Sequence, residues 1–338
     1  GPKKKEMSRL YSFESNLSLT GANADYRSPI RPSEVGLYIG NLYNLIAAKA
    51  GAPAISVAKV DDTATLTKAA NDLWASKGAS IVVSGENDIS VQTVVNAINN
   101  LLGNYGSTLS WDAPVMTKQG DDAMMDVFVT DLSQGLVSGV IFFNCNPVYD
   151  HPKGAVIGSS LSKAKFTLST SDRVDETTSQ VTYVAPDNHY LESWNDAEPA
   201  KGQYSLSQPA ISNIFNTRQA QQSFLTWGNV STSYFDFIKE NWKETHFASQ
   251  TEIGDFQTFW DQCLYNGVFE GDATSTMSAV EFSGDANAAA TKIAGKYKKG
   301  TGLELVTYES IAIGAGEQAN NPWLQEMPDP LSKVCWEN

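Results

Sequence analysis

The chain has 338 residues, of which 41% are hydrophobic and 18% are charged, a composition typical of a globular protein rather than a disordered one. Its 38 acidic residues outnumber 24 basic ones and give a formal net charge of -14. This balance argues against a nucleic-acid partner, because affinity for phosphates depends on cationic side chains. No apolar stretch is long enough to span a bilayer. The basic residues 3–5 precede no apolar signal-peptide segment, and Gly1-Pro2 resembles a protease-cleavage remnant.

The first elements predicted are a short strand at residues 9–14, a polar loop to residue 31 and a helix at 32–48 that has a proline in its first turn. A Gly-Ala-Pro break follows at 51–53. Apolar spacing predicts a second helix over 66–77, which a glycine closes.

A series of α/β elements comes next. The apolar run 79–83 is typical of a strand buried on both faces, and an amphipathic helix is predicted at 91–102. Three more strands are expected at 139–143, 165–170 and 181–186. Strands that alternate with helical segments indicate an α/β fold with a Rossmann-like, largely parallel sheet flanked by helices.

The second half of the chain is rich in aromatic residues. Residues 198–209 read as polar and irregular, and helices are predicted at 224–242 and 256–264. Small residues dominate 271–302, and 274–290 is the best candidate for a mobile loop. A further strand is expected at 303–308. The predicted domains are the tail of a preceding Rossmann-type half (1–49), the Rossmann-like domain (50–200), a helical return segment (201–300) and the start of a truncated C-terminal domain (301–338).

The metal-binding residue types are few and scattered. The histidines and cysteines show no C-x-x-C pair and no metal-ligand spacing, so we predict no metal site and no four-cysteine iron–sulfur cluster within this chain. We expect buried free thiols. The residues concerned are Cys145, Cys263, Cys335, His151, His189 and His246.

Two other motifs favour plain structural interpretations. Residues 314–319 fit G-x-G-x-x-A, but the dinucleotide motif needs a helix to begin there, and Asn320-Asn321-Pro322 follows instead. An acid-rich stretch near His189 is the most tempting acid–base cluster, and we interpret it as a solvated loop with a capping carboxylate. Its acids are Asp187, Glu192, Asp196 and Glu198.

The loops after the predicted strands are the stronger candidates for a site, because ligands of open α/β sheets bind outside the carboxyl ends of the strands. These loops offer short amide, hydroxyl and carboxylate groups suited to a nucleoside. The same residue types also populate ordinary turns, so both interpretations stay open. The residues are Gly85, Asn87, Asn146, Pro147, Asp172 and Thr177.

Several segments resemble a known family. Residues 320–330, NNPWLQEMPDP, resemble the NNPWLQELPDP signature of molybdopterin-oxidoreductase-like chains. Residues 14–34 look like the family's ESxxxLTGAxADHR…RPSE stretch. Similar segments are GEN…NxLLGN at 85–104, NPVYD at 146–150, SDRxDET at 171–177 and PDxHxLESW at 186–194. The likeness spans almost the whole chain and is most specific for the large iron–sulfur subunit of alternative complex III, a respiratory quinol:electron-acceptor oxidoreductase.

The resemblance implies cofactor-binding positions. In true molybdopterin enzymes of this superfamily, equivalent loops hold a guanosine of the bis-guanine-dinucleotide cofactor. The implied positions, which we expect to be vestigial, are Gly85, Asn87, Asn146, Asp172 and Thr177, with Asn321 near the pterin. The superfamily's acidic-Gly-Arg stretch appears here as residues 200–203 without the arginine. We therefore expect no cofactor in this chain, with the family's iron–sulfur clusters in a downstream part.

The resemblance leads to a structural and assembly domain without catalysis, on the periplasmic face, peripheral to the membrane through other subunits and the downstream iron–sulfur domain. One alternative is an active molybdopterin oxidoreductase fragment that binds guanine nucleotide at the strand ends. Another is an independent small-molecule binding protein. Residues 320–330 contain three prolines, which predicts an extended loop without helix or strand. We expect Trp323 to dock in an apolar pocket and align the next domain, since the family continues beyond residue 338.

Overall fold

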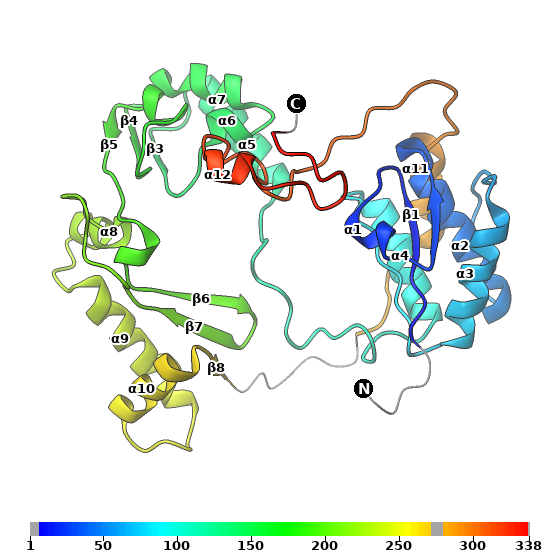
Figure 1. Ribbon diagram of the computed structural model, residues 1–338, viewed down its shortest axis with the longest axis horizontal. Coiled ribbons are helices and arrows are strands. Elements are labelled where there is room, and N and C mark those ends of the chain that lie inside the picture. The colour runs from blue at the N-terminus through cyan, green and yellow to red at the C-terminus, as the bar shows by residue number, and fades with distance from the viewer. Residues whose placement is uncertain (1–6, 272–279, 337–338) are drawn as a thin grey trace. The chain divides into compact units, whose positions relative to one another are not determined.

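The computed structural model describes residues 7–271 and 280–336 and shows an α/β protein with parallel sheets and flanking helices (Figure 1). The chain forms two compact units. The first comprises Gly1–Trp111, Thr276–Gly314 and Gln318–Asn338, and the second comprises Asp112–Ser275 and Ala315–Glu317. These divisions do not coincide with the domain boundaries expected at residues 49, 200 and 300.

The first unit begins with a small β–α–β arrangement. Strands β1 (Tyr11–Glu14) and β2 (Tyr26–Pro29) pair in parallel, with Tyr11 opposite Tyr26. The four-residue helix α1 (Leu19–Ala22) lies between them in the chain, and the Ser18 side chain caps it. Parallel strands end at the same edge of a sheet, so the loop after β1 marks one edge of this unit.

Helices provide most of the first unit's core. The 3-10 helix η1 (Pro32–Glu34) leads into α2 (Val35–Ala50), which is followed by α3 (Thr63–Ala75) and α4 (Ile89–Leu101). Helix α11 (Ala286–Lys296) packs on α4 and α2. The core is aliphatic and alanine-rich, and Ile46, Ile98 and Ile293 are fully buried in it. The expected helices at 32–48, 66–77 and 91–102 are confirmed.

Two predicted strands of the first unit are wrong. Residues 79–83 are extended without being a strand, because the Asn99 side chain in α4 bonds both the N–H and the C=O of Val82, where a neighbouring strand would pair. Ile81 and Val83 are exposed rather than buried on a second face. Residues 303–308 also form no strand, and Leu303 is fully exposed.

The stretch 274–290, expected to be a mobile loop, lies partly outside the described residues. Its last part is instead the start of α11, where Ala289 and Ala290 are buried. Alanine is the best helix former and lets helices approach closely. The absence of bulky residues therefore marks a packed helix here.

The second unit begins with helix α5 (Asp122–Gln134) and a three-stranded parallel sheet in the order β3-β4-β5. Its strands are β3 (Gly139–Phe142), β4 (Phe166–Ser169) and β5 (Tyr183–Val184). The helices α6 (Pro147–Asp150) and α7 (Gly154–Ser160) with η2 (Leu161–Lys163) connect β3 to β4, and η3 (Thr178–Gln180) precedes β5. The three strands expected here are confirmed, although β3 buries alternate residues only.

A second, antiparallel sheet follows η4 (Tyr190–Glu192). It has the order β6-β7-β8, from β6 (Asn195–Ala200), β7 (Gln203–Ser207) and β8 (Phe269–Glu270). The irregular structure expected at 198–209 is therefore wrong. The hairpin turns at Lys201–Gly202, and Gly202 has φ +83°, which a glycine adopts without strain.

Aromatic side chains form the core beside this sheet. Helices α8 (Ala220–Trp227), α9 (Tyr234–Thr245) and α10 (Phe256–Asn266), with η5 (Phe247–Ser249), follow the hairpin. Trp242, Phe259 and Trp260 are buried at its centre. Cys263 is the only buried cysteine, so the expectation of buried thiols is wrong for Cys145 and Cys335, which are exposed.

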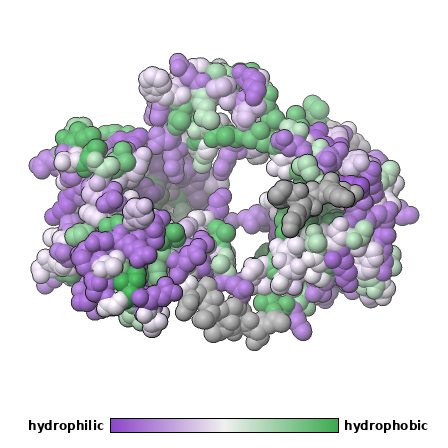
Figure 2. All heavy atoms as spheres, turned by 60° about the horizontal axis from the view of Figure 1, so that its bottom comes forward, coloured by the Kyte–Doolittle hydropathy of each residue, from purple (hydrophilic) through white to green (hydrophobic). Residues whose placement is uncertain are grey.

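No helix in the described part of the chain is both long and apolar enough to cross a membrane. The face drawn in Figure 2 mixes hydrophilic and hydrophobic residues.

Candidate functional site at the strand ends

The structure brings Asn146 and Thr177 together at the carboxyl ends of β3 and β4. Asn146 Oδ1 accepts hydrogen bonds from the Thr177 backbone N–H (3.1 Å) and hydroxyl (2.7 Å). Thr177 is fully buried, and its hydroxyl also accepts the N–H of Val148 at 3.2 Å. The Asn146 amide donates to Glu176 at 2.8 Å. These hydrogen bonds join the two strand-end loops to each other.

Asp172 lies in the same β4 loop and is more accessible, with its side chain 37% exposed. Its carboxylate forms a two-point pair with Arg173, from Nε to Oδ1 at 2.8 Å and from Nη2 to Oδ2 at 3.1 Å. The hydrogen bond from Arg173 lowers the pKa of Asp172. Asp172 is therefore a charged acceptor that a ligand would share with Arg173.

The chain itself covers part of the β3 end. Residues 315–317 lie against α6, where a Cβ on Gly316 would be 2.7 Å from the Tyr149 hydroxyl. Gly316 has φ +103°, so this close approach requires glycine. Burial and the charge of Glu317 raise the pKa of Asp150. The G-x-G-x-x-A motif thus serves a close backbone contact with α6.

Gly85 and Asn87 belong to the first unit and are both exposed. They precede α4, whose N-terminus is already capped. Asp88 Oδ1 accepts the N–H groups of Ser90 (2.8 Å) and Val91 (3.4 Å), and Asp88 Oδ2 pairs with Lys296 at 2.7 Å. The Lys296 hydrogen bond lowers the pKa of Asp88. The helix end that could hold a phosphate holds this carboxylate.

A similar arrangement at the end of β1 was not predicted. The Glu14 carboxylate, 16% exposed, accepts hydrogen bonds from Ser18 N (3.2 Å), Ser18 Oγ (2.5 Å) and Arg27 Nε (2.6 Å). Burial acts to raise the pKa of Glu14, but these bonds outweigh it and the pKa is lowered. A Cβ on Gly21 would overlap the carboxylate, so glycine is needed beside it.

A third carboxylate, that of Glu304, accepts hydrogen bonds in the segment just before α2. Glu304 accepts the Ser33 N–H at 3.0 Å and the Ser33 hydroxyl at 2.7 Å, and it lies 3.5 Å from Arg31 Nη1. Arg31 also donates to the carbonyl of Gly302 at 2.5 Å. Arg31 and Ser33 are part of the RPSE segment. No short-range pattern signals this pair, because 271 residues separate Ser33 and Glu304 in the chain.

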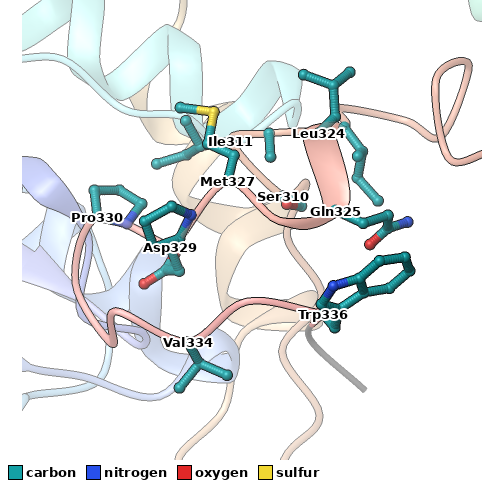
Figure 3. Close-up of a pocket in the computed structure, with 12 residues that line it drawn as sticks. Ser310, Ile311, Leu324, Gln325, Met327, Asp329, Pro330, Val334 and Trp336 are labelled. Atoms are coloured by element: carbon teal, nitrogen blue, oxygen red, sulfur yellow. The ribbon is translucent and has the colours of Figure 1, made fainter. Parts of the chain in front are cut away.

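Asn321, the position implied to lie near the pterin, caps α12 (Pro322–Gln325) and accepts the Trp323 N–H at 3.1 Å. The prediction that 320–330 contains no helix is therefore wrong, since Asn321-Pro322 is a regular N-cap and first helical position. Residues 310–313, 324–325, 327–330, 334 and 336 line a small pocket here (Figure 3), which the Trp336 ring borders. Trp323 is 82% exposed, so its expected docking is also wrong.

The acids between Asp187 and Glu198 accept hydrogen bonds from other groups of the chain. Asp187 accepts the N–H of Ala220, Glu192 forms a capping box with His189, and Asp196 accepts the indole N–H of Trp242 at 2.9 Å. The expected capping carboxylate is Glu192, and Asp187 and Asp196 also accept hydrogen bonds within the chain rather than only from solvent. Within residues 7–271 and 280–336, no three His, Cys, Asp or Glu side chains are arranged to hold a metal.

Comparison with known proteins finds similarity to a curated protein and to solved structures, and no family model matches. The chain is 28% identical over 251 residues to the menaquinone reductase, molybdopterin-binding-like subunit of Nitratidesulfovibrio vulgaris, a match that covers 63% of this chain and 36% of that protein. It superimposes on acetylene hydratase from Pelobacter acetylenicus with a TM-score of 0.52 at 11% identity, covering 83% of this chain and 50% of the other. The chain thus spans half or less of either relative. Its sequence is therefore similar to that of a molybdopterin-binding-like subunit, and its fold is similar to that of acetylene hydratase.

Proposed function

We propose that the chain is a non-catalytic, molybdopterin-oxidoreductase-like part of a respiratory quinol:electron-acceptor oxidoreductase of the alternative complex III type. Its role is structural and concerns assembly, beside iron–sulfur clusters that lie in other parts of the complex. In this proposal it works at the periplasmic face and reaches the membrane only through partner subunits. The similarity to a subunit of menaquinone reductase supports a partner-dependent role in quinone chemistry.

One observation carries the non-catalytic part of the proposal. In the first unit, three groups of donors suited to a phosphate each bind a carboxylate of the chain itself. Ser18 with Arg27 bind Glu14, the α4 N-terminus binds Asp88, and Ser33 with Arg31 bind Glu304. A nucleotide phosphate at these donors would have to displace a carboxylate from its hydrogen bonds, which supports the proposal that the chain holds no molybdopterin guanine dinucleotide.

Asp172 favours the second candidate, an active fragment that binds guanosine at the strand ends of the second unit. Its carboxylate is partly exposed at the carboxyl end of β4, where ligands of α/β sheets bind. The two candidates differ in what Asp172 does, which makes it the residue to change.

The test uses the assembled protein. A tagged copy is purified from native membranes under mild detergent, and quinol oxidation is assayed with wild type and Asp172→Asn. We expect stoichiometric co-purification with other subunits and turnover within twofold of wild type in the variant. Purification of the chain without partners would contradict the assembly role. Loss of turnover in Asp172→Asn, with assembly intact, would support the active-fragment alternative.

A further inference from the structure

Residues 310–313 and the segment around α12 line a small pocket that belongs wholly to the first unit (Figure 3). Its volume is about 110 Å³. An apolar cavity of roughly 150 Å³ accepts one benzene molecule, so this pocket matches a single ring and is too small for a nucleotide. The pocket is therefore suited to the end of one large side chain.

The walls of this pocket are mainly apolar. The carboxylate among them is that of Asp329, whose Oδ1 already accepts the N–H groups of Leu331 (2.9 Å) and Ser332 (2.6 Å). The Gln325 side-chain amide donates to the Ala319 carbonyl at 2.9 Å, which leaves the Gln325 side-chain carbonyl as an acceptor. Such walls favour an uncharged ring with a hydrogen-bond donor. The larger apolar lining residues are Ile311, Ile313, Leu324, Met327, Val334 and Trp336.

A ring of this kind lies next to the pocket on the same helix. Trp323 is 82% exposed, whereas Leu324, the following residue, lines the pocket. The backbone that carries Trp323 is fixed, because Asn321 accepts the Trp323 N–H at 3.1 Å and the Glu326 N–H bonds the Pro322 carbonyl at 3.0 Å. Insertion of the indole into a pocket would therefore cost little backbone entropy. An indole is an apolar ring system with one N–H donor, which is the chemistry that the pocket favours.

We propose that two copies of this chain associate through α12, with Trp323 of each copy inserted into the pocket of the other. A protruding ring and a matching pocket on one molecule form a self-complementary surface, and twofold symmetry then gives two identical contacts in each dimer. Trp323 and Leu324 are adjacent in the chain, so both contacts fall close to the symmetry axis and the assembly closes as a dimer. This inference does not depend on the proposed function.

Electrostatic repulsion between two copies is weak at this surface. The whole chain has a net charge of -14, but the charged residues of 318–336 are two acids and one lysine, a net charge of -1. A central tryptophan surrounded by weaker apolar contacts is the usual anchor of a protein interface. The contact is small, so the dimer should dissociate on dilution. The surrounding apolar side chains, each about half exposed, are Ile311, Met327, Val334 and Trp336.

The test measures the mass of the purified chain by sedimentation velocity at rising protein concentration. We expect wild type to dimerise and Trp323→Ala to self-associate at least about thirtyfold more weakly, the usual effect of removing a tryptophan anchor. Ala312→Leu, which fills the pocket, should be similarly defective. The control is Tyr265→Ala, which removes a 91% exposed ring of the second unit and should match wild type. In dilute solution, Trp323→Ala should keep the thermal midpoint of wild type, because the ring is exposed in the monomer.

A mixture of the two variants distinguishes a second copy from any other occupant of the pocket. Trp323→Ala keeps the pocket and Ala312→Leu keeps the tryptophan, so an equal mixture can form one of the two contacts. We expect the mixture to dimerise more strongly than either variant alone and more weakly than wild type. A mixture no better than the separate variants would overturn the reciprocal contact. A wild-type chain that stays monomeric at its highest soluble concentration, or a dimer that Trp323→Ala leaves intact, would overturn the inference as a whole.

Discussion

The strand-end loops of the two units are closed in different ways. In the first unit, carboxylates occupy donors that suit a phosphate, as at Glu14 with Ser18 and Arg27. In the second unit, an amide and a hydroxyl tie two loops together at Asn146 and Thr177. The strand-end carboxylate of the second unit, Asp172, is 37% exposed, compared with 16% for Glu14 in the first unit. The two units thus close their strand ends with different internal contacts.

The cores differ as well. The first unit packs aliphatic residues and alanines between helices, whereas the second has an aromatic cluster around Trp242. Large aromatic side chains bury more area each, so single substitutions there should cost more than elsewhere.

The largest effect is expected for Trp242→Ala. Trp242 is 1% exposed and its indole N–H donates to Asp196 at 2.9 Å. Its removal should lower the free energy of unfolding by about 3–5 kcal/mol. The control is Trp323→Ala, which should change that energy by less than about 0.5 kcal/mol because Trp323 is 82% exposed. Urea denaturation followed by circular dichroism measures both, and equal effects would refute the assignment of these cores.

Thr177→Val tests the hydrogen bonds that join the two strand-end loops of the second unit. The variant leaves the Val148 N–H without its acceptor and Asn146 Oδ1 with the Thr177 N–H alone. We expect a loss of about 1–3 kcal/mol in the free energy of unfolding. Thr177→Ser, which keeps the hydroxyl, should lose clearly less. A valine variant as stable as wild type would show that these hydrogen bonds are dispensable.

Glu14→Gln is the corresponding test in the first unit and should cost about 1 kcal/mol, since the partly exposed carboxylate loses charge-assisted bonds. Because the folded pKa of Glu14 is lowered, its contribution is present above the unfolded value of about 4.3 and is lost as the pH falls through the folded value. The stability difference between wild type and variant should therefore shrink at acidic pH. A difference that stays constant from pH 6 to pH 3 would contradict this.

The smallest effect is expected for His246, which should make the second unit less stable than the first at acidic pH. Burial among the rings of Tyr204, Trp242 and Phe269 lowers the pKa of His246, although Asp196 and Glu198 oppose that shift. Its contribution is present above the unfolded value of about 6.5 and is lost as the pH falls below it. Hydrogen exchange between pH 7 and pH 5 should show earlier opening of α9 than of α4, and His246→Gln should remove the difference.

Local sequence patterns predicted those helices and strands that depend mainly on residues close together in the chain. The apolar stripes of α2, α3 and α4 and the runs of β3 and β4 could be read directly. Contacts between distant residues could not. The apolar run at 79–83 is not a strand because a helix side chain, Asn99, takes the pairing groups of Val82. The hairpin β6–β7 carries mostly small and polar residues, so its alternation is weak.

In the candidate site, too, some contacts could be predicted from the sequence and others could not. Asn146 and Thr177 were predicted and do meet, because the ends of adjacent parallel strands are neighbours. The Ser33–Glu304 contact was missed, since nothing near either residue indicates the other. Trp323 was misjudged because an aromatic residue beside prolines does not by itself specify a pocket.

The central proposal is that the chain holds no molybdopterin guanine dinucleotide, because its own carboxylates occupy donors that would suit a phosphate. The most direct measurement is the molybdenum and guanine-nucleotide content of the assembled protein from native membranes, by elemental mass spectrometry and by chromatography after denaturation. The account predicts iron from the clusters of the complex but no stoichiometric molybdenum and no released guanine nucleotide. One molybdenum with guanine nucleotide per chain would contradict it.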